Sequence, residues 1–248
     1  MLCKPPILKL LLVSFISALL SFNSYAKDTE QLTAEYKKLA NGPSAELVKN
    51  KLREAFGGKE ALQGLRSFEA KLTIRAPQEP TKSSRSFYSF ARKTIAKQDT
   101  DGSLSMLKGQ HAIKLVNENV IRLSRKEVKS LAGNMKLNFF YLLRNKHLKL
   151  IGPLEVAEHP NESWWIFKLR KTQSPPIGVD LKSGQIRKVL FDDGSYVAES
   201  NYQKISCGLN WPLNFTVFKG NSVQLQGEFS DIRINQSPSF ETPLWFYP

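Results

Sequence analysis

Residues 57–76, GGKEALQGLRSFEAKLTIRA, contain the change of hydrophobic period that decides the fold. Up to Leu65 the apolar residues follow the spacing of a helix. From Phe68 onward apolar and polar residues alternate, so that Phe68, Leu72 and Ile74 share one face of an extended chain. A period of two residues is typical of a strand with one face in water. The stretch therefore predicts a helical segment that leads directly into a sheet.

The residues before this stretch predict a helical lead-in over residues 27–66. Residues 29–39 have the spacing of a short amphipathic helix, which the Asn-Gly-Pro sequence at 41–43 ends. A second helix begins at Ser44 and carries apolar residues at helical spacing up to Phe56. The glycine pair that follows closes this helix, because glycine adopts the left-handed backbone that ends many helices.

Residues 1–26 have the organisation of a cleavable export signal. Two lysines and no acid precede an apolar run from Leu10 to Phe22, and Ser24-Tyr25-Ala26 supplies the small residues that a signal peptidase requires. The run of about 13 residues is shorter than the roughly 20 that span a bilayer. We therefore expect cleavage after Ala26 and a periplasmic mature protein, residues 27–248, that forms a single domain.

This cleavage separates the two cysteines of the chain. Cys3 leaves with the signal peptide, so Cys207 is alone in the mature protein and has no partner for an intramolecular disulfide. Its position beside Gly208, before an apolar strand, favours a small buried side chain over a reactive thiol.

Beyond residue 76 the alternation recurs in short segments that turn sequences separate. Predicted strands cover residues 86–97, 106–107, 112–116, 120–123, 148–158, 164–170, 177–181, 186–191, 196–205, 213–219 and 223–234. Such segments, separated by Asp-Gly, Ser-Gly and Gly-Asn turns, are typical of a meandering antiparallel sheet, here of roughly 10 or 11 strands. In the last strand the apolar phase slips between Phe229 and Ile232, which predicts a bulge and a curved sheet.

One helix is expected to interrupt the sheet near residues 126–145. Its apolar residues keep helical spacing, and they are Val128, Leu131, Met135, Phe139, Leu142 and Leu143. Such a helix either packs permanently on one face of the sheet or covers a cavity as a lid. The sequence leaves both alternatives open.

The charge of the chain indicates anionic partners. The formal net charge of +14 falls to +12 when Lys4 and Lys9 leave with residues 1–26. A basic surface favours anionic envelope lipids or an acidic protein partner. The lysines and arginines are scattered along the sequence and the protein is predicted to be exported, so we expect no nucleic-acid binding and a monomeric protein.

No pattern of catalytic or metal-binding residues occurs. His111, His147 and His159 are too far apart in sequence for a metal-binding motif, and no nucleophile elbow, phosphate-binding loop or dinucleotide fingerprint is present. The acids of Asp192-Asp193-Gly194 fit a hairpin turn better than a catalytic pair. The sequence therefore predicts a protein that is not an enzyme and that has no cofactor or metal.

Four stretches occur in an order that resembles one known family. They are Gly57-Gly58-x-x-Ala61-Leu62-x-x-Leu65-x-Ser67, Val179-Asp180-x-x-Ser183-Gly184, Gly208-Leu209-Asn210-Trp211-Pro212, and Asp231-Ile232-x-x-Asn235 followed by Pro238, Phe240 and Pro243. Together they resemble the outer-membrane lipoprotein-sorting superfamily, the LolA/LolB-like proteins, as a divergent paralogue. The resemblance implies a mainly-β fold: a strongly curved antiparallel half-barrel of about eleven strands (residues 67–248) with helices covering its concave face.

The same resemblance implies a carrier or chaperone that holds a lipid or lipoprotein acyl chain between sheet and helices. From the alternation along strands and helix, the side chains expected to line that cavity are Leu72, Ile74, Leu131, Met135, Phe139, Trp165, Phe167, Phe215 and Val217. The alternative is a non-catalytic envelope interaction module, with a fully packed core and a basic docking surface.

Overall fold

The computed structural model describes residues 43–109, 111–117, 119–125, 127–129, 131–132, 139–145, 148–159, 162–169, 176–191 and 194–242. The predicted signal peptide and the helix expected over residues 29–39 lie outside these ranges. So do His147 and Met135.

The described residues form one antiparallel sheet of thirteen strands. The strands are β1 (Ser67–Arg75), β2 (Lys82–Ser89), β3 (Thr94–Asp99), β4 (Leu104–Lys108), β5 (His111–Val116), β6 (Asn119–Arg122), β7 (Leu150–His159), β8 (Glu162–Leu169), β9 (Ile177–Val179), β10 (Ile186–Leu190), β11 (Ser195–Lys204), β12 (Asn210–Lys219) and β13 (Ser222–Ile234). This confirms the expected mainly-β fold, with more strands than the sequence suggested.

One expected strand, residues 86–97, is in fact parts of two. β2 ends at Ser89 and β3 begins at Thr94, and the turn between them places Lys93 in the left-handed region at φ 54°. This turn, Phe90-Ala91-Arg92-Lys93, contains neither glycine nor proline. Because the usual turn residues are absent, the sequence gives no local sign that the strand ends there.

Among the described residues, α2 (Ala45–Ala55) and α3 (Gly58–Gly64) precede β1, and α5 (Phe139–Arg144) lies between β6 and β7. The N-terminus of α2 is capped by Ser44, whose hydroxyl accepts a hydrogen bond from the Leu47 amide at 3.2 Å. The described residues of the expected helix near 126–145 are helical at 125, 127–129 and 131–132 and again in α5. No helix in the described ranges is long and apolar enough to cross a membrane.

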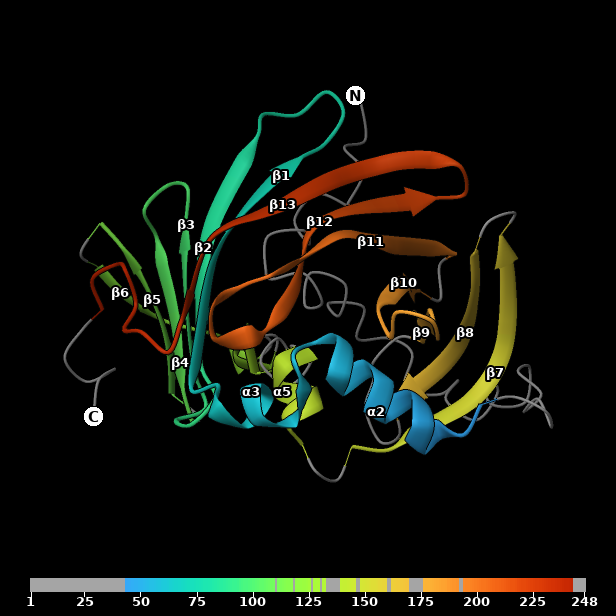
Figure 1. Cartoon of the computed structure of the whole chain (residues 1–248). Coiled ribbons are helices and arrows are strands. Elements are labelled where there is room, and N and C mark those ends of the chain that lie inside the picture. Colours follow the sequence, from blue (N-terminus) through green and yellow to red (C-terminus); the bar gives the residue numbers. More distant parts are fainter. Residues whose placement is uncertain are drawn as a thin grey trace.

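The strand order explains how distant parts of the chain meet. From β1, in the middle of the sheet, the chain builds outward to β6 at one edge, crosses to β7 at the other edge, and returns strand by strand to β13, which pairs with β1. Figure 1 shows the sheet bent into an arch, with α2, α3 and α5 across its opening. The crossing between the two edges brings α5 to the concave side.

β13 contains the irregularity that the sequence predicted. Glu69 and Lys71 of β1 pair with Arg233 and Ser230, so β13 has one extra residue where its apolar phase slips, and Asp231 there has a φ of 47°. A second shift lies where Val217 and Phe218 of β12 pair with β13. Bulges bend the strand that carries them, so β13 supports the curvature of the arch.

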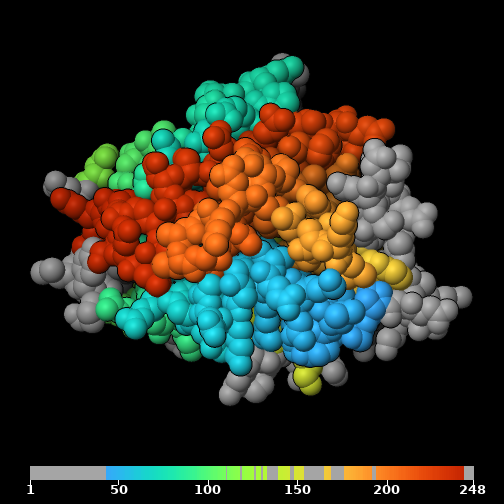
Figure 2. Space-filling model, viewed as in Figure 1, coloured from blue at the N-terminus to red at the C-terminus, as the bar shows by residue number. Residues whose placement is uncertain are grey.

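The main apolar core lies between the concave face and the helices. It contains Val48 and Leu52 of α2, Phe56 directly after that helix, residues of α3 and α5, and inward side chains from most strands. In the space-filling view, α2 and α3 (blue and cyan) lie directly against β11 and β12 (orange) (Figure 2).

A second, smaller core lies on the opposite, convex face. It contains Phe87, Ala96, Leu104 and Met106, with Phe240 of the C-terminal segment packed on them. Glu69 fixes this segment, because its carboxylate accepts hydrogen bonds from the Ser239 amide at 2.9 Å and from the Ser239 hydroxyl. The sheet is therefore buried on both faces around β2 to β4.

The expectation of a buried Cys207 is wrong. Cys207 is exposed and lies in a single 3-10 turn, η2 (Ser206–Gly208), with a φ of 62°. The carbonyl oxygen of Gly208 on this turn lies close to Gly57, so the backbone of the turn packs inward while the Cys207 side chain is exposed.

Candidate functional site

The four sequence stretches that carry the family resemblance meet where the helices dock on the sheet. Gly57, between α2 and α3, has a φ of +118°, and a Cβ built there would lie 2.6 Å from the carbonyl oxygen of Gly208. Gly184 has a φ of +70°, and its Cβ would lie 2.5 Å from the carbonyl oxygen of Lys51 in α2. Only glycine permits these two approaches without displacement of the backbone.

Two asparagines of the same stretches complete the docking with side-chain hydrogen bonds. Asn210 donates from Nδ2 to the Ala55 carbonyl at 2.6 Å, at the end of α2. Asn235 accepts from the Arg66 amide at 2.6 Å and donates to the Gly64 carbonyl at 3.0 Å, at the end of α3. These residues therefore hold the helices on the sheet, which is a positioning role and not ligand contact.

A matched pair of glycine substitutions tests this docking. We expect Gly184→Ala to lower the free energy of unfolding by about 2–4 kcal/mol, because the new methyl group strains a left-handed backbone and also meets the α2 carbonyl. Gly194 has a similar φ of +75° with nothing within 4 Å, so Gly194→Ala measures the backbone strain alone. Urea unfolding of both variants gives the difference, and equal losses would contradict the docking role of Gly184.

Of the nine side chains predicted to line a cavity, eight belong to the concave core. Leu72, Leu131, Phe139, Phe167, Phe215 and Val217 are buried within it, and Ile74 and Trp165 pack against it. Met135 lies outside the described residues. The structure thus brings together residues from β1, β8, β12 and the region of α5 on one apolar surface, and their contact with a ligand stays a prediction.

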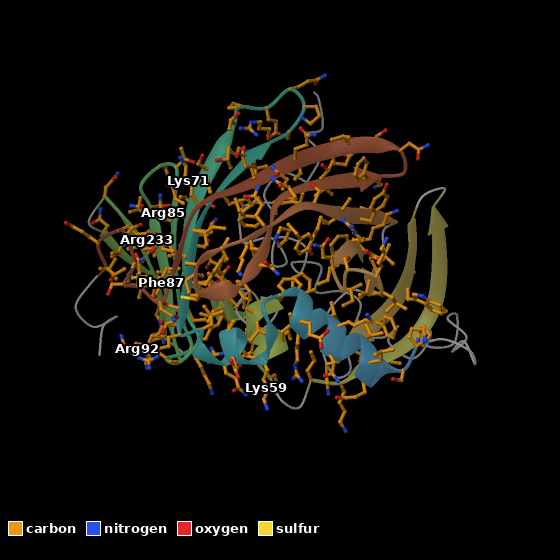
Figure 3. All side chains as sticks on the ribbon, viewed as in Figure 1. Lys59, Lys71, Arg85, Phe87, Arg92 and Arg233 are labelled. Carbon is orange, nitrogen blue, oxygen red and sulfur yellow. The ribbon has the colours of Figure 1, made fainter. Side chains whose placement is uncertain are left out.

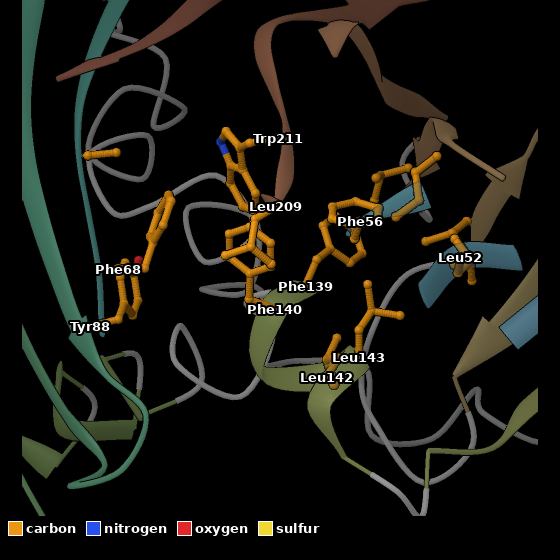
Figure 4. Packing of buried hydrophobic residues seen from close by; sticks show 14 of the residues in the cluster. Leu52, Phe56, Phe68, Tyr88, Phe139, Phe140, Leu142, Leu143, Leu209 and Trp211 are labelled. Atoms are coloured by element: carbon orange, nitrogen blue, oxygen red, sulfur yellow. The ribbon is translucent and has the colours of Figure 1, made fainter. Parts of the chain in front are cut away.

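Phe56, the residue that follows α2, is the centre of the aromatic part of this core. It is fully buried, and its ring centroid lies 5.9 Å from that of Tyr202, 6.0 Å from Phe139, 6.1 Å from Phe140 and 6.4 Å from Trp211. Figure 4 shows Phe56 between Leu52 on one side and the Phe140 and Trp211 rings on the other. One side chain therefore connects α2, α5, β11 and β12.

Arg53 of α2 binds the end of α5. Its guanidinium donates from Nε to the Leu143 carbonyl at 3.1 Å and from Nη2 to the Asn145 carbonyl at 2.9 Å. Carbonyls at a helix C-terminus have no partner within the helix, and a cation satisfies them favourably. The two helices across the opening of the arch are thus joined by polar as well as aromatic contacts.

Glu199 places a carboxyl group on the concave face, and no cation forms an ion pair with it among the described residues. Glu199 follows Val197 by two residues and pairs with Phe215 of β12, so it lies on the apolar side of β11, and it is only 3% exposed. The Tyr202 hydroxyl lies 2.5 Å from Glu199 Oε2 and 3.0 Å from the Ile186 carbonyl oxygen. Glu199 Oε1 has no hydrogen-bond partner among the described residues.

Burial raises the pKa of Glu199 from the ordinary 4.5 to about 8, although the hydrogen bond with Tyr202 opposes the rise. Burial, and then the neighbouring Glu199, raise the pKa of Tyr202 well above its ordinary 10. At pH 7 the pair is therefore mostly neutral. The Tyr202 hydroxyl donates to Glu199 Oε2, and the Ile186 carbonyl oxygen is its second possible acceptor.

A buried lysine lies on the same face at a different place. Lys97 follows Ile95 of the concave core by two residues, and its Nζ lies 2.6 Å from Asp99 Oδ1. Burial lowers the pKa of Lys97, and Asp99 opposes this effect. Lys97 thus has its counter-ion within β3, unlike Glu199, which has none.

The convex face carries three of the basic side chains labelled in Figure 3. Lys71, Arg85 and Arg233 share this face on β1, β2 and β13. Arg85 donates to Glu69 at 3.0 Å and to Asp231 at 2.9 Å, and Arg233 donates to the Gln236 side chain at 2.7 Å. Two of the three cations are therefore engaged in contacts that hold β13 and the C-terminal segment on the sheet.

Sequence reasoning missed Glu199, Tyr202, Phe56 and Arg53 as parts of the site. Glu199 had a usable signal, because it is a charged residue in phase with Val197 on a predicted strand. Tyr196 and Ala198 are also apolar, however, so the alternation did not show which phase faces inward. In the described ranges no group of three or more His, Cys, Asp or Glu residues is placed to bind a metal.

Comparisons with known proteins place the fold. No protein-family model matches the sequence, and no curated protein matches it either. A LolA superfamily protein from Nitrosomonas europaea superposes with a TM-score of 0.53 at 14% identity, over 79% of this chain and 96% of that one. A DUF1329 family protein from Desulfovibrio piger superposes with a TM-score of 0.50 at 11% identity, over 80% of this chain and 96% of that one.

These superpositions confirm the resemblance inferred from the four sequence stretches at the level of the fold. The chain has the LolA-like fold, an open curved antiparallel sheet with helices across its concave side, in a divergent sequence. At these identities the likeness concerns architecture alone.

Proposed function

We propose that the protein is a periplasmic carrier that binds the acyl chain of a lipid or lipoprotein between the concave face and the helices α2, α3 and α5. The observation that carries this proposal is the continuous apolar surface that runs from β1 across β13, β12 and β11 to β8 on the inner side of the arch. An open sheet with one apolar face and short covering helices can expose a site for hydrocarbon.

The dimensions support this proposal. Seven neighbouring strands from β1 to β8 span about 29 Å at the usual strand spacing of ~4.8 Å. α2, with 11 residues, is about 16 Å long, and α3 and α5 are shorter. Each helix is thus shorter than this apolar surface is wide, and a ligand gains access when α5 moves away from it.

The contacts of the helices suit such a movement. Arg53 joins α2 to α5 by hydrogen bonds to carbonyl groups, and these exchange readily with water when the helices separate. The glycine and asparagine contacts hold α2 and α3 to the sheet more firmly, because there the backbones themselves meet. We infer that α5 is the element that moves and that α2 and α3 are its fixed support.

The first test is purification of the protein from a periplasmic extract without detergent, followed by organic extraction and mass spectrometry. We expect a stoichiometric acyl lipid or lipoprotein. A brominated acyl chain then places the ligand, because bromine quenches indole fluorescence on contact, and Trp211→Phe is expected to lose a large share of the quenching.

A protein that contains no lipid and binds no acyl probe would contradict the carrier proposal. That outcome would favour the alternative, an envelope interaction module whose core is permanently packed. The closely packed rings around Phe56 are the observation that favours this alternative.

A further inference from the structure

β6 forms one edge of the sheet, at the end opposite β7 (Figure 1). In the described part of the chain no strand pairs with its outer side, which we call the free edge. All four residues of β6 are exposed, and among them Val120 is 66% and Ile121 49% exposed although both side chains are large and apolar. An exposed edge of this kind can pair with a strand of another chain.

The register of β6 shows which backbone groups point to the free edge. β6 runs antiparallel to β5, and the pairing continues to the Leu123 amide, which donates to the Ala112 carbonyl at 3.2 Å. In an antiparallel pair, every second residue makes both of its backbone hydrogen bonds with the neighbouring strand. Ile121, two residues before Leu123, therefore bonds to β5. The N–H and C=O groups of Val120 and Arg122 point to the free edge instead.

β7, the opposite edge of the sheet, is protected against further pairing. Pro153 has no N–H to donate, the register with β8 shifts between Ile151 and Glu155, and α2 lies against the strand. β6 contains no proline, no lysine and no shift in its register with β5. The two edges therefore differ, and β6 keeps the features of a strand that can accept another.

The side chain of Val120 continues the convex apolar core to the free edge. Leu104 of that core pairs with Leu115, and Leu115 pairs with Val120, so the three lie in one row across β4, β5 and β6. Exposure increases along this row, from the buried Leu104 through the partly buried Leu115 to the exposed Val120. A further strand would place a side chain beside Val120 in the same row and cover it.

The charges at the free edge favour an acidic neighbour. Arg122 and Arg125 are exposed, and neither forms a hydrogen bond or an ion pair with another described residue. Glu127 accepts hydrogen bonds from the Ser124 amide at 2.8 Å and the Ser124 hydroxyl at 2.6 Å, and Lys114 lies near it. The two arginines therefore add an unbalanced positive charge beside two exposed apolar side chains.

We propose that the free edge of β6 binds a partner protein by strand addition, and that the partner supplies an extended segment in which two apolar residues follow an acidic one. In antiparallel order the acidic residue lies opposite Arg122, and the apolar residues lie opposite Ile121 and Val120. The outward N–H and C=O groups of Val120 and Arg122 bond to the backbone of the segment. This surface lies outside the acyl site, so the proposal does not depend on the carrier function.

Two other occupants fit the free edge less well. A second copy of the chain would bring two Arg122 side chains together on a pair of four-residue strands, and each chain has a formal net charge of +14. A bilayer would accept the apolar side chains, but it offers no hydrogen-bond partner to the outward N–H and C=O groups. A separate acidic strand satisfies both the charge and the backbone.

Two fluorescein-labelled peptides test the proposal by fluorescence anisotropy. The first is Thr-Glu-Val-Val-Thr-Ser, in which the glutamate lies opposite Arg122 and the valines lie opposite Ile121 and Val120. The second has lysine in place of the glutamate. We expect saturable one-to-one binding of the glutamate peptide, and binding of the lysine peptide that is about three- to tenfold weaker, because it places like charges opposite each other.

A proline at position 120 tests the backbone contact. Val120→Pro removes an N–H that points to the free edge and is not part of the pairing with β5, so its melting temperature is expected to stay close to that of the wild-type protein. It is expected to weaken binding of the glutamate peptide at least about tenfold, because a donor is lost and the proline ring occupies the pairing side. Val120→Thr keeps the N–H and the branched side chain, and is expected to bind within about threefold of the wild-type protein.

Charge reversal gives a second, independent test. Arg122→Glu is expected to prefer the lysine peptide over the glutamate peptide, and this result decides the question even where Val120→Pro lowers the melting temperature. Binding of an acyl probe is expected to be unchanged in all three variants, because Val120 and Arg122 lie on the convex side. Loss of acyl binding in the wild-type protein would refute the carrier function alone.

Several results would overturn strand addition. They are the absence of saturable binding of the glutamate peptide up to about 1 mM, unchanged binding by Val120→Pro, and a peptide preference that Arg122→Glu does not reverse. Vesicles of phosphatidylglycerol and sedimentation velocity test the other occupants. Vesicle binding or self-association that depends on Val120, without peptide binding, would assign the free edge to a lipid surface or to a second copy.

Discussion

We expect the free energy of unfolding of the wild-type protein to fall by about 3–4 kcal/mol between pH 5 and pH 8 because of Glu199, and Glu199→Gln to remove this fall. The folded protein keeps the Glu199 proton up to about pH 8, because burial raises the pKa, whereas the unfolded chain releases it near the ordinary 4.5. Each pH unit between these values therefore favours unfolding by about 1.4 kcal/mol.

The sign of this effect identifies its source. A group with a raised pKa in the folded state makes its full contribution to the free energy of unfolding below about pH 4.5. This stabilisation is lost as the pH rises to about 8. Asp101, Glu127 and Asp180 have lowered pKa values, so their contribution is present above the ordinary carboxyl pKa and is lost only on acidification below it. They therefore act outside the window from pH 5 to pH 8.

Urea unfolding at pH 5, 6, 7 and 8 measures the effect. We expect a falling free energy for the wild-type protein and a nearly constant one for Glu199→Gln, which cannot ionise. Parallel pH profiles for the two proteins would mean that Glu199 is ionised in the folded state, and that its environment is not the apolar one described above.

Phe56→Ala is expected to lower the free energy of unfolding by about 3–5 kcal/mol, the range for removal of a buried aromatic side chain. The ring contacts four other aromatic residues, and no single element can fill the space that it leaves, because they come from α5, β11 and β12. The substitution also removes the main apolar contact of the end of α2.

An exposed apolar residue of α2 provides the control for loss of a buried side chain. Leu47 is 47% exposed, so Leu47→Ala is expected to change the free energy of unfolding by less than about 1 kcal/mol. Urea unfolding followed by tryptophan fluorescence, which reports on Trp211 beside Phe56, measures both variants. A similar small loss for Phe56→Ala would show that the aromatic rings around it do not form a packed core.

The sequence predicted most of the local structure because local structure depends on neighbouring residues. The alternation from Phe68 placed β1 to within a residue or two, and the phase slip after Phe229 predicted the bulge in β13. The prediction of one strand over residues 86–97 was wrong, because the turn between β2 and β3 has no glycine or proline. The prediction for Cys207 was also wrong, because there the backbone and not the side chain faces inward.

The four family stretches predicted the fold for a physical reason that only the structure shows. Gly57, Gly184, Asn210 and Asn235 are separated in sequence but meet where helices dock on the sheet. A backbone geometry that admits only glycine, or a hydrogen bond that needs asparagine, restricts the residue at that position, whereas many apolar residues can fill the core around it. These positions therefore indicate architecture, and they carry no information about a ligand.

The sequence by itself determined the period of each strand, the positions of most turns and the helices before β1, because these depend on residues a few positions apart. The tertiary structure decided which face of each strand lies inside the arch and which polar atoms remain unpaired there. Burial depends on contacts such as that of Asn235 with Arg66, 169 positions away, and that of Arg53 with Leu143, 90 positions away. No local pattern records such contacts, so the inward position of Glu199 became visible only when β11 was placed against β12.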